Sequence, residues 1–569
     1  MWFVLPEDPS VSYHGSRFHE RPAHSTARPS AAVSDTLVAP PRRSPPRHRK
    51  GRHRGRSRAW LATLVVVALG LAAWRSGLAD PLLHRAGAPA SPQPSRARQP
   101  TPSVVPSSVP TSPPIPAAQP RLSQGPINTA FPGLTTFRGN ATRDYYGEGP
   151  LPSHPAILWR YPTTGGMCMQ SSSLGKTQTW CGTGWTGQPN VIPHKNGTIE
   201  IREGAYDGRY HFLNGKTGQP LRPDLATGDL AKGSATSDAD GYPLYYGGSR
   251  DNWLRVIALD RAAPTVLWKI NSRAVPHLMW NDDWDAAPLQ IGDYLLEGGE
   301  NSWFYVIRLN RHYDQHGLVQ VQPKIVMLVP GWDQEELQAI HDHDISIENS
   351  VAFAGGVVYF ANSGGLVQGW DISDVLKGGT HYSRVFRFWN GDDTDASIVI
   401  DPQGYLYVAR KMEENVHRPS AFFRDHQIGS LMKLDPRRPD DPVVWSVQLG
   451  GFEPDGGMLG TPALYRGVIY DTYTEGGFAA VDAKTGKLLW KVQLPGPTWM
   501  SPVPIDKQLL VGDCNGVLHD YDISHPRQLP QEVWTVQLSG CIESTPAVWH
   551  GMIWVGSRGG AIYGIGDAR

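Results

Sequence analysis

Cysteine is scarce in this 569-residue chain, which contains only four: Cys168, Cys181, Cys514 and Cys541. No two of them are adjacent, and none has the spacing of a zinc site or of a C-x-x-C-H haem-attachment motif. A zinc-binding module and a covalently attached haem are therefore excluded. The sequence also lacks a recognisable nucleophile arrangement of the kind a hydrolase requires.

Acidic residues are absent between Arg42 and Arg58, a stretch that contains nine lysines and arginines. The apolar run that follows, residues 59–74, is close to the length of a helix that spans a bilayer. The positive-inside rule then predicts a disordered cytoplasmic tail (1–58) and a single transmembrane helix (59–75) in the plasma membrane, with all later residues outside the cytoplasm. A long, cleaved signal peptide is the alternative to a permanent signal-anchor.

Residues 76–124 are rich in proline, with eleven between positions 86 and 120, which predicts a semi-rigid stalk. Residues 125–569 contain 36 basic and 48 acidic residues, a net charge of −12, although the whole chain sums to zero. An acidic surface argues against nucleic acid as a partner. We expect a monomer attached to its own membrane.

The segment from Ala480 to Trp490, AVDAKTGKLLW, matches the pattern A-x-D-x-x-T-G-x-x-x-W. Ala258 to Trp268 repeats the Ala, Asp and Trp of this pattern at the same spacing. The pattern is typical of β-propellers whose tryptophans pack between neighbouring blades. The tryptophans predicted to dock in this way are Trp159, Trp268, Trp445, Trp490 and Trp534.

Short apolar runs separated by turn residues form eight strand-turn-strand units, whose central hairpins begin at Glu203, Tyr245, Leu296, Tyr359, Leu406, Tyr470, Leu510 and Trp554. They predict an all-β, eight-bladed propeller over residues 125–569. The last unit has no room for a fourth strand, so we expect residues 156–162 to close the ring. Cys168 and Cys181 share one loop, and Cys514 and Cys541 lie at adjacent points on one face. The disulfides 168–181 and 514–541 are therefore favoured among three connectivities.

The innermost strand of each unit begins with a four-residue pattern of small residues, such as KGSA, DAAP, ENSV or ESTP. Its first position is occupied by Thr186, Lys232, Asp285, Glu348, Asp395, Leu459, Trp499 and Glu543. Because strands alternate their side chains, these eight residues should lie on one equivalent face and line the mouth of the central channel. Rim candidates in nearby turns are Arg250, Asp251, Glu300, Asn301 and Arg558.

Carboxylates at the mouth repel one another and need compensation, which Lys232, raised pKa values, water or a bound cation can supply. The sequence leaves two readings open. In one, a metal such as Ca²⁺ is held by Asp285, Glu348, Asp395 and Glu543. In the other, the acids only cap loops and pair across blades. Trp499 and Trp284 could stack a planar ring or a sugar, or could pack between blades.

The docking repeat, together with the runs KGSATSDADGYPLYYGGSRDNWLRV, GENSWFYVIRLN and GCIESTPAVW, resembles the pyrroloquinoline-quinone-like propeller superfamily, and in particular its membrane-anchored, exported members. This superfamily includes alcohol and sugar dehydrogenases as well as non-catalytic scaffolds. The resemblance implies that a dehydrogenase would hold the quinone over the channel, bind Ca²⁺ through Glu and Asn, and use an Asp base. Candidates for these roles are Glu348, Asn349, Asp285 and Asp395.

Two functions follow from this sequence. The first is a binding or scaffold module of the cell envelope, whose mouth contacts a protein, a cell-wall glycan or a small ligand. The alternative is a quinone- and Ca²⁺-dependent dehydrogenase. The chain departs from the dehydrogenases in having no adjacent cysteine pair and no haem module to accept electrons, so the binding module is favoured.

Overall fold

The computed structural model describes residues 125–173, 175–184, 187–343, 345–412, 424, 426–452 and 456–568. The predicted tail (1–58), transmembrane helix (59–75) and stalk (76–124) lie outside these ranges. Within them, no helix combines the length and the apolar character needed to cross a membrane.

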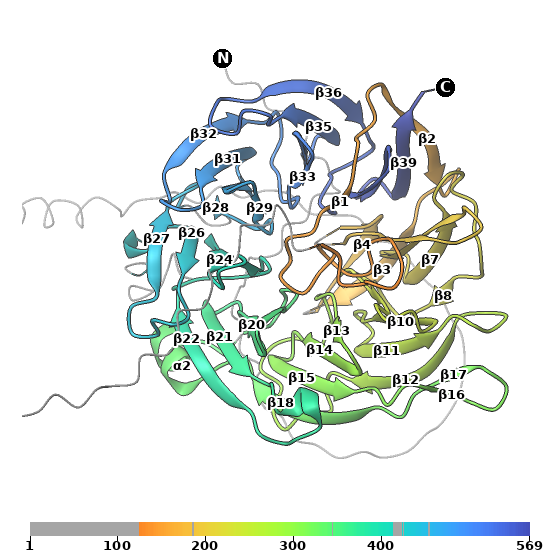
Figure 1. The fold of residues 1–569 in the computed structure, drawn as a ribbon, viewed down its shortest axis with the longest axis horizontal. Coiled ribbons are helices and arrows are strands. Elements are labelled where there is room, and N and C mark those ends of the chain that lie inside the picture. Colours follow the sequence, from red (N-terminus) through yellow and green to blue (C-terminus); the bar gives the residue numbers. More distant parts are fainter. Residues whose placement is uncertain are drawn as a thin grey trace, which may run out of the picture. The chain divides into compact units, whose positions relative to one another are not determined.

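Eight sheets follow one another around a ring, each blade with its first strand towards the centre (Figure 1). Seven are four-stranded and antiparallel, and the eighth has four antiparallel strands with a fifth, β1 (Gly147–Glu148), added in parallel. Blade 1 contains β5 (Asn190–Pro193), β6 (Ile199–Ala205), β7 (Arg209–Asn214) and β8 (Leu225–Ala226). Blade 2 contains β9 (Thr236–Ser237), β10 (Leu244–Gly247), β11 (Trp253–Ala258) and β12 (Thr265–Asn271). Blade 3 contains β13 (Leu289–Ile291), β14 (Tyr294–Gly298), β15 (Trp303–Arg308) and β18 (Lys324–Pro330). Blade 4 contains β19 (Ala352–Ala354), β20 (Val357–Phe360), β21 (Leu366–Asp371) and β22 (Ser383–Trp389).

The second half of the ring repeats this arrangement. Blade 5 contains β23 (Val399–Ile400), β24 (Leu406–Ala409), β26 (Leu431–Leu434) and β27 (Val443–Val447). Blade 6 contains β29 (Ala463–Tyr465), β30 (Val468–Tyr473), β31 (Gly477–Asp482) and β32 (Leu488–Gln493). Blade 7 contains β33 (Val503–Ile505), β34 (Gln508–Gly512), β35 (Val517–Asp522) and β36 (Gln531–Gln537). Blade 8 contains β37 (Ala547–Trp549), β38 (Met552–Ser557) and β39 (Ala561–Asp567), and its outer strand is β2 (Pro155–Tyr161).

Loops between the blade strands carry the remaining elements. Three short antiparallel pairs are β3 (Cys168–Ser173) with β4 (Lys176–Cys181), β16 (His312–Tyr313) with β17 (Val319–Gln320), and β25 (Lys411–Met412) with β28 (Gly456–Gly457). Helix α2 (Gln334–Ile340) begins after its cap Asp333, and the 3₁₀ helix η1 covers Val375–Lys377. The two predicted disulfides, Cys168–Cys181 and Cys514–Cys541, are both present.

Strand β2 closes the ring as predicted, because it pairs antiparallel with β39, so that the first and last strands of the propeller share one blade. The register runs from Pro155 opposite Asp567 to Tyr161 opposite Ile562. An unclosed last blade would leave an edge open to aggregation. The eight-bladed all-β architecture expected from the sequence is therefore confirmed.

Outer strands of seven blades share one irregularity, a register shift that leaves a single extra residue just before a large side chain. The extra residues are Leu158, Leu267, Val326, Val385, Val444, Leu489 and Val533. Such a β-bulge re-aims the next side chain and bends the strand. That next residue is one of the five predicted docking tryptophans in five blades, and Met327 and Phe386 in blades 3 and 4.

The docking tryptophans reach the neighbouring blade. Trp159 Nε1 donates to the Gly215 carbonyl oxygen at 2.8 Å, and Trp445 Nε1 donates to that of Ala483 at 3.2 Å. The glycine of the Thr-Gly motif leaves room for the ring: at Gly486, whose φ is +72°, a Cβ would lie 2.7 Å from Trp445. The repeat is thus a packing device between blades.

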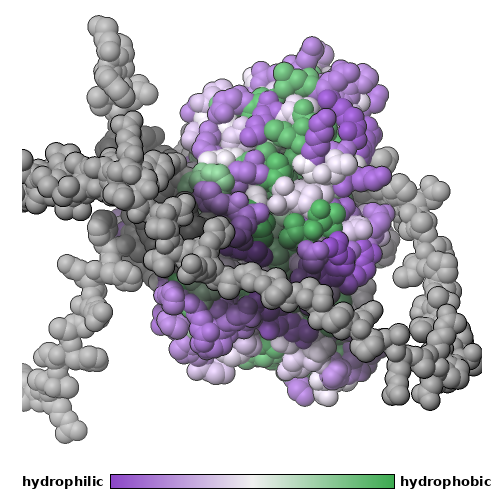
Figure 2. Space-filling model, turned by 90° about the vertical axis from the view of Figure 1, so that its left-hand side faces the viewer, coloured by the Kyte–Doolittle hydropathy of each residue, from purple (hydrophilic) through white to green (hydrophobic). Residues whose placement is uncertain are grey.

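Outer strands also form the surface seen from the side in Figure 2, where hydrophilic and hydrophobic residues are interspersed on the part of the propeller that grey atoms leave visible. The bulge residues Val385 and Val444 are 44% and 39% exposed. Because each occupies a bulge, the edge around it is bent, which disfavours pairing with another chain.

The small-residue pattern of the inner strands has a structural explanation at its third position. There, a serine or threonine hydroxyl accepts a hydrogen bond from a backbone N–H of the preceding blade, at 2.8–3.0 Å in five places. The hydroxyls are those of Ser234, Ser350, Ser397, Thr461 and Ser501. This hydroxyl belt links adjacent inner strands where side chains must be small.

Residues 127–150, which we call the plug, lie in the middle of the ring (orange in Figure 1) and contact the inner edges of all eight blades. The plug bonds to blade 1 through Leu134 and Val191, and to blade 4 through Ala141 and Phe353. Its contacts with the other six blades include Thr236, Pro288, Ile400, Thr461, Pro502 and Val548. Its last part, β1 (Gly147–Glu148), pairs in parallel with β37.

Two fully buried arginines anchor the plug. Arg138 donates to the carbonyl oxygens of Thr461 (2.7 Å) and Pro502 (2.8 Å), and Arg143 donates to that of Val351. These three acceptors lie just before the inner strands β29, β33 and β19.

Other parts of the plug bond nearer the turns that lead into the second strands: Glu148 and Pro150 accept from the N–H groups of His550 and Gly551 in the β37–β38 turn. The plug therefore fills the channel on the side of these turns, and its two arginines reach from there towards the predicted mouth.

Candidate channel-mouth site

Lys232 of blade 2 lies among three carboxylates of blade 3. Its Nζ is 3.0 Å from Glu300 Oε1 and 3.3 Å from Asp283 Oδ2, and it also pairs with Asp285 Oδ2. All four residues are buried, with 0% to 6% of their surface exposed. The loop before β13 supplies Asp283 and Asp285, and the β14–β15 turn supplies Glu300. We call these four residues the ammonium cluster.

A second cation and an amide border the ammonium cluster. Arg250 Nε donates to Asp283 Oδ2 at 2.6 Å, and Asn281 Nδ2 donates to Glu300 Oε2 at 2.6 Å. Arg250 is itself buried. Two buried cations thus face three buried carboxylates, so the desolvation cost of each charge is offset by partners at hydrogen-bond distance.

Burial shifts the titration of this cluster. Burial alone would lower the pKa of Lys232. The negative charges of Asp285 and Glu300 have a larger opposite effect and hold this pKa well above its ordinary value. Burial and the neighbouring Asp285 hold the pKa of Glu300 well above its ordinary value. Burial also raises the pKa of Asp285, although Lys232 opposes the shift. These shifts favour the ammonium form of Lys232 and disfavour the ionised forms of Asp285 and Glu300.

Glu348, in blade 4, is partly exposed and accepts a hydrogen bond from Ser346 Oγ at 2.6 Å. Burial of its carboxyl, with Asp395 and Glu300 nearby, raises its pKa well above the ordinary value. Of the charged neighbours of Glu348, Asp395 of blade 5 contributes most to this shift.

The side chain of Asn349 forms hydrogen bonds with backbone groups. Its Nδ2 donates to the carbonyl oxygens of Ala361 (2.7 Å) and Thr394 (2.8 Å), and its Oδ1 accepts from the Ala361 N–H at 3.2 Å. The residue is fully buried. Asn349 therefore joins blades 4 and 5 and has no oxygen directed to a ligand.

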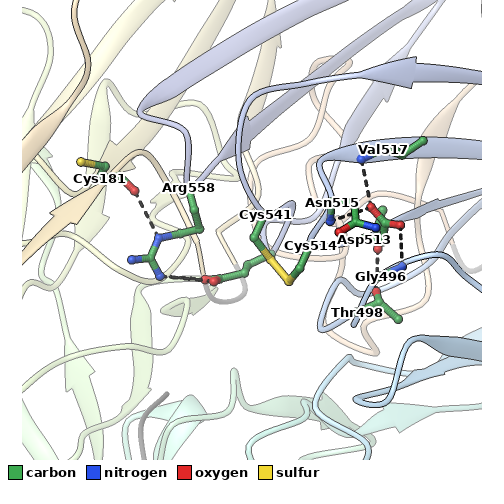
Figure 3. Close-up of a disulfide and its surroundings, with 11 residues drawn as sticks. Cys181, Gly496, Thr498, Asp513, Cys514, Asn515, Val517, Cys541 and Arg558 are labelled. Carbon is green, nitrogen blue, oxygen red and sulfur yellow. Dashed lines mark hydrogen bonds and ion pairs between the residues drawn. A yellow bond between two sulfur atoms is a disulfide. The ribbon is translucent and has the colours of Figure 1, made fainter. Parts of the chain in front are cut away.

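Glu543, in blade 8, pairs with Arg558, whose Nη1 is 3.2 Å from Glu543 Oε1. Arg558 Nε also donates to the Cys181 carbonyl oxygen at 3.2 Å, and Figure 3 shows this arginine between Cys181 and the Cys514–Cys541 disulfide. The predicted rim residue Arg558 thus neutralises the predicted ligand Glu543. Of the other rim candidates, Asn301 bonds to Ser272 and Tyr305, and Asp251 pairs with Arg255.

The β3–β4 hairpin, whose base is joined by the Cys168–Cys181 disulfide, covers the mouth over blades 1 and 2. Its Trp180 ring has the Arg250 and Arg558 guanidinium carbons each 4.9 Å from the ring centre, and Tyr206 packs against it edge-on. Ser171 of the hairpin lies 3.5 Å from Arg250. We call this hairpin the lid. No repeat or motif in the sequence indicated it.

The two tryptophans considered for stacking differ. Trp284 is 1% exposed, packs on Tyr305 and donates to the Asn252 carbonyl oxygen, so it is a blade-packing residue. Trp499 is partly exposed at the frame position of blade 7. Of the remaining frame positions, Leu459 is buried and Thr186 lies outside the described residues.

The four carboxylates predicted as metal ligands do not share one environment: Asp285 pairs with Lys232 and Glu543 with Arg558. Among the described residues, the group of acids close enough to hold one metal is Asp283, Asp285 and Glu300, with ligand atoms within 4.8 Å of one another. The Lys232 ammonium already contacts all three of these acids. Together with the backbone-bonded Asn349, this arrangement does not fit a quinone-linked Ca²⁺ site. A cation at Glu348 and Asp395 stays a prediction.

Comparison with known proteins gives one family match: the model of the outer membrane protein assembly factor BamB matches residues 429–565, from β26 to β39. No curated protein matches the chain. Solved structures are similar to it at low identity. A europium-containing methanol dehydrogenase is 12% identical, with 77% of this chain and 99% of that chain covered and a TM-score of 0.52. BamB from Moraxella catarrhalis is 15% identical, with 70% and 99% covered and a TM-score of 0.45.

Proposed function

We propose that this chain, a PQQ-like β-propeller repeat protein, is a binding or scaffold module of the cell envelope that presents its channel-mouth face to a protein or glycan. The observation that carries the proposal is the closure of the channel by the chain itself. The plug fills one end of the channel. At the other end, under the lid, Asp285 and Glu300 pair with Lys232 and Glu543 pairs with Arg558, so these carboxylates already have cation partners within the chain.

Orientation supports the same proposal. The described chain begins in the plug, where Asn140 Nδ2 donates to the Gly125 carbonyl oxygen at 3.0 Å. Gly125, the first described residue, is therefore at the plug. If residues 59–75 anchor the chain in the plasma membrane, the connection enters the propeller through the plug and not through the mouth.

The exposed lid is the part of this face best suited to contact. Its outer surface carries Gln170, Ser172, Thr177 and Thr179, all exposed and uncharged. Polar side chains of this kind form adaptable hydrogen bonds with a protein or a glycan. The partly exposed Trp499 and Glu348 add an aromatic ring and a carboxylate on the same face.

A face-specific cross-linking experiment tests the proposal. A photo-reactive amino acid is placed at Thr179 on the lid and, as the matched control, at exposed Lys507 in the β33–β34 turn on the plug side. In cells that produce the full chain, we expect a discrete adduct of protein or glycan from position 179 and none from position 507. Adducts from position 507 only, or equal yields from both, would contradict a partner at the mouth.

A further inference from the structure

The carboxylates of Asp283, Asp285 and Glu300 converge as ligands of a cation do. All three are buried, and one oxygen of each lies within 4.8 Å of the others. Oδ1 of Asp283 and Oδ1 of Asp285 are buried and receive no hydrogen bond from any N–H or O–H of the described residues. Buried carboxylate oxygens left in this state are costly unless a positive charge is close.

The chain itself supplies that charge. Lys232 Nζ contacts an oxygen of each of the three carboxylates, and the lysine starts the inner strand of blade 2 while its three partners belong to blade 3. One ammonium with three carboxylates from a neighbouring blade is not a simple ion pair. The three carboxylates are arranged like the ligands of a bound cation, and the Lys232 ammonium, which belongs to the chain itself, is in the place of that cation.

We propose that the Lys232 ammonium takes the place of a divalent cation in this site, so that the propeller is metal-independent as it stands and loss of the ammonium turns the trio into a Ca²⁺ site. This goes beyond the proposed binding function and does not depend on it. The donor set, all hard oxygen, is the kind that Ca²⁺ prefers.

The dimensions favour Ca²⁺ over Mg²⁺. Carboxylate oxygens lie about 2.7–2.9 Å from an ammonium nitrogen in a charge-assisted hydrogen bond. Ca²⁺ holds its oxygens at about 2.3–2.6 Å in flexible geometry, whereas Mg²⁺ requires about 2.0–2.1 Å in a regular octahedron. In this site Glu300 Oε1 and Asp283 Oδ2 lie 3.0 and 3.3 Å from the ammonium nitrogen, so they need to move inward by about 0.4–1.0 Å for Ca²⁺ and further for Mg²⁺, with water completing the shell.

Another buried lysine provides a matched control. Lys433 lies in blade 5 and is 8% exposed, and its Nζ contacts Asp401 Oδ2 (3.3 Å), Tyr407 Oη (2.8 Å) and the Ala483 carbonyl oxygen (3.2 Å). It thus has one carboxylate where Lys232 has three. Removing either ammonium leaves buried negative charge, but only at Lys232 does removal leave three converging carboxylates.

The experiment compares the full wild-type chain in detergent with Lys232→Ala, Lys232→Met and Lys433→Ala, by calorimetric titration with CaCl₂ and by melting temperature. We expect Lys232→Ala to bind one Ca²⁺ more than wild type, with a dissociation constant on the order of 10⁻⁴ to 10⁻³ M, the range of weak extracellular sites. Its melting temperature should rise with Ca²⁺ and not with Mg²⁺. Adding Asp283→Asn to Lys232→Ala should abolish the additional Ca²⁺ binding. Lys433→Ala should bind no more Ca²⁺ than wild type.

Three results would overturn the proposal: equal Ca²⁺ binding by wild type and Lys232→Ala, a gain that Asp283→Asn leaves unchanged, or a folded Lys232→Ala chain that binds no additional Ca²⁺. If neither Lys232 variant folds without metal, the proposal is tested by refolding Lys232→Ala with and without Ca²⁺. Recovery of Lys232→Ala in CaCl₂ but not in NaCl of equal ionic strength supports the proposal, and failure to recover in CaCl₂ contradicts it.

Discussion

Arg143 of the plug donates two hydrogen bonds, from Nε (2.9 Å) and Nη2 (2.7 Å), to the carbonyl oxygen of Val351 in blade 4. Both residues are buried, and the arginine also donates to the Phe137 carbonyl oxygen. An arginine that forms its hydrogen bonds with backbone carbonyls leaves several acceptors unsatisfied when it is removed. Arg143 therefore holds the plug to blade 4 through a backbone group, which depends little on side-chain identity in that blade.

Replacement of Arg143 should destabilise the whole propeller. Arg143→Met keeps much of the side-chain volume but removes the donors to Val351 and Phe137, and we expect a loss of about 2–4 kcal/mol in the free energy of unfolding. Chemical denaturation of the full chain measures it, with exposed Arg209→Met as the control. Equal unfolding midpoints for the two variants would show that the plug does not support the ring.

The hydroxyl belt makes a similar prediction between blades. Ser397 Oγ accepts from the Ser350 N–H at 3.0 Å, and both residues are buried. Ser397→Ala leaves that N–H unsatisfied, so the unfolding free energy should fall by about 1–3 kcal/mol. The same change at exposed Ser172 of the lid should have little effect. A loss at Ser172 as large as that at Ser397 would contradict the role of the belt.

Glu336 of α2 predicts a pH dependence. Burial raises its pKa to about 8, although Asn362 donates to its Oε2 at 3.0 Å. The folded protein keeps a proton that the unfolded chain releases near pH 4.5, so this residue lowers stability as pH rises from 4.5 to 8. Stability measured across this range should fall more steeply for wild type than for Glu336→Gln, by on the order of a few kcal/mol. Exposed Glu335→Gln should keep the wild-type slope, and parallel profiles for all three would contradict the prediction.

Trp180 should keep the lid closed, because Arg250 and Arg558 both stack on its ring. Trp180→Leu removes both cation–π contacts, which contribute about 0.5–2 kcal/mol each. Trypsin should then cut after exposed Lys176 of the lid several times faster, with little change in the unfolding midpoint. Trp253→Leu, which removes a cation–π contact with Lys269 away from the lid, serves as the control. An unchanged cutting rate would show that the arginines do not hold the lid.

The architecture could be predicted from the sequence because propeller signals are local and repeated. The Trp-containing pattern around Trp490 recurs at a fixed frame, and the missing fourth strand of the last unit required a segment such as residues 156–162. Blades 3 and 4 show the limit of this approach. Met327 and Phe386 occupy the docking position there, so the same bulge and packing exist without the tryptophan that identified them elsewhere.

The plug and the lid could not be predicted in the same way. Arg138 contacts residues 323 and 364 positions away, and no repeat or spacing indicates such distant partners. At the mouth, the sequence predicts a shared frame of eight positions, but the partner of each charge also depends on turns of other blades. Arg558 comes from such a turn and pairs with Glu543, whereas Asp285 pairs with Lys232, itself one of the eight positions.

The most direct test of the account is whether the channel mouth takes up a quinone. The full chain in detergent is incubated with pyrroloquinoline quinone and CaCl₂, separated from unbound quinone by gel filtration, and assayed for quinone absorbance and for dye reduction with alcohols and sugars. A quinoprotein methanol dehydrogenase treated identically is the positive control. Because the chain's own residues close the channel and supply cation partners for Asp285 and Glu543 at the mouth, we predict that no quinone co-elutes and no dye is reduced. Stoichiometric quinone that supports dye reduction and is lost in Glu348→Gln would contradict the binding-module account and establish a dehydrogenase.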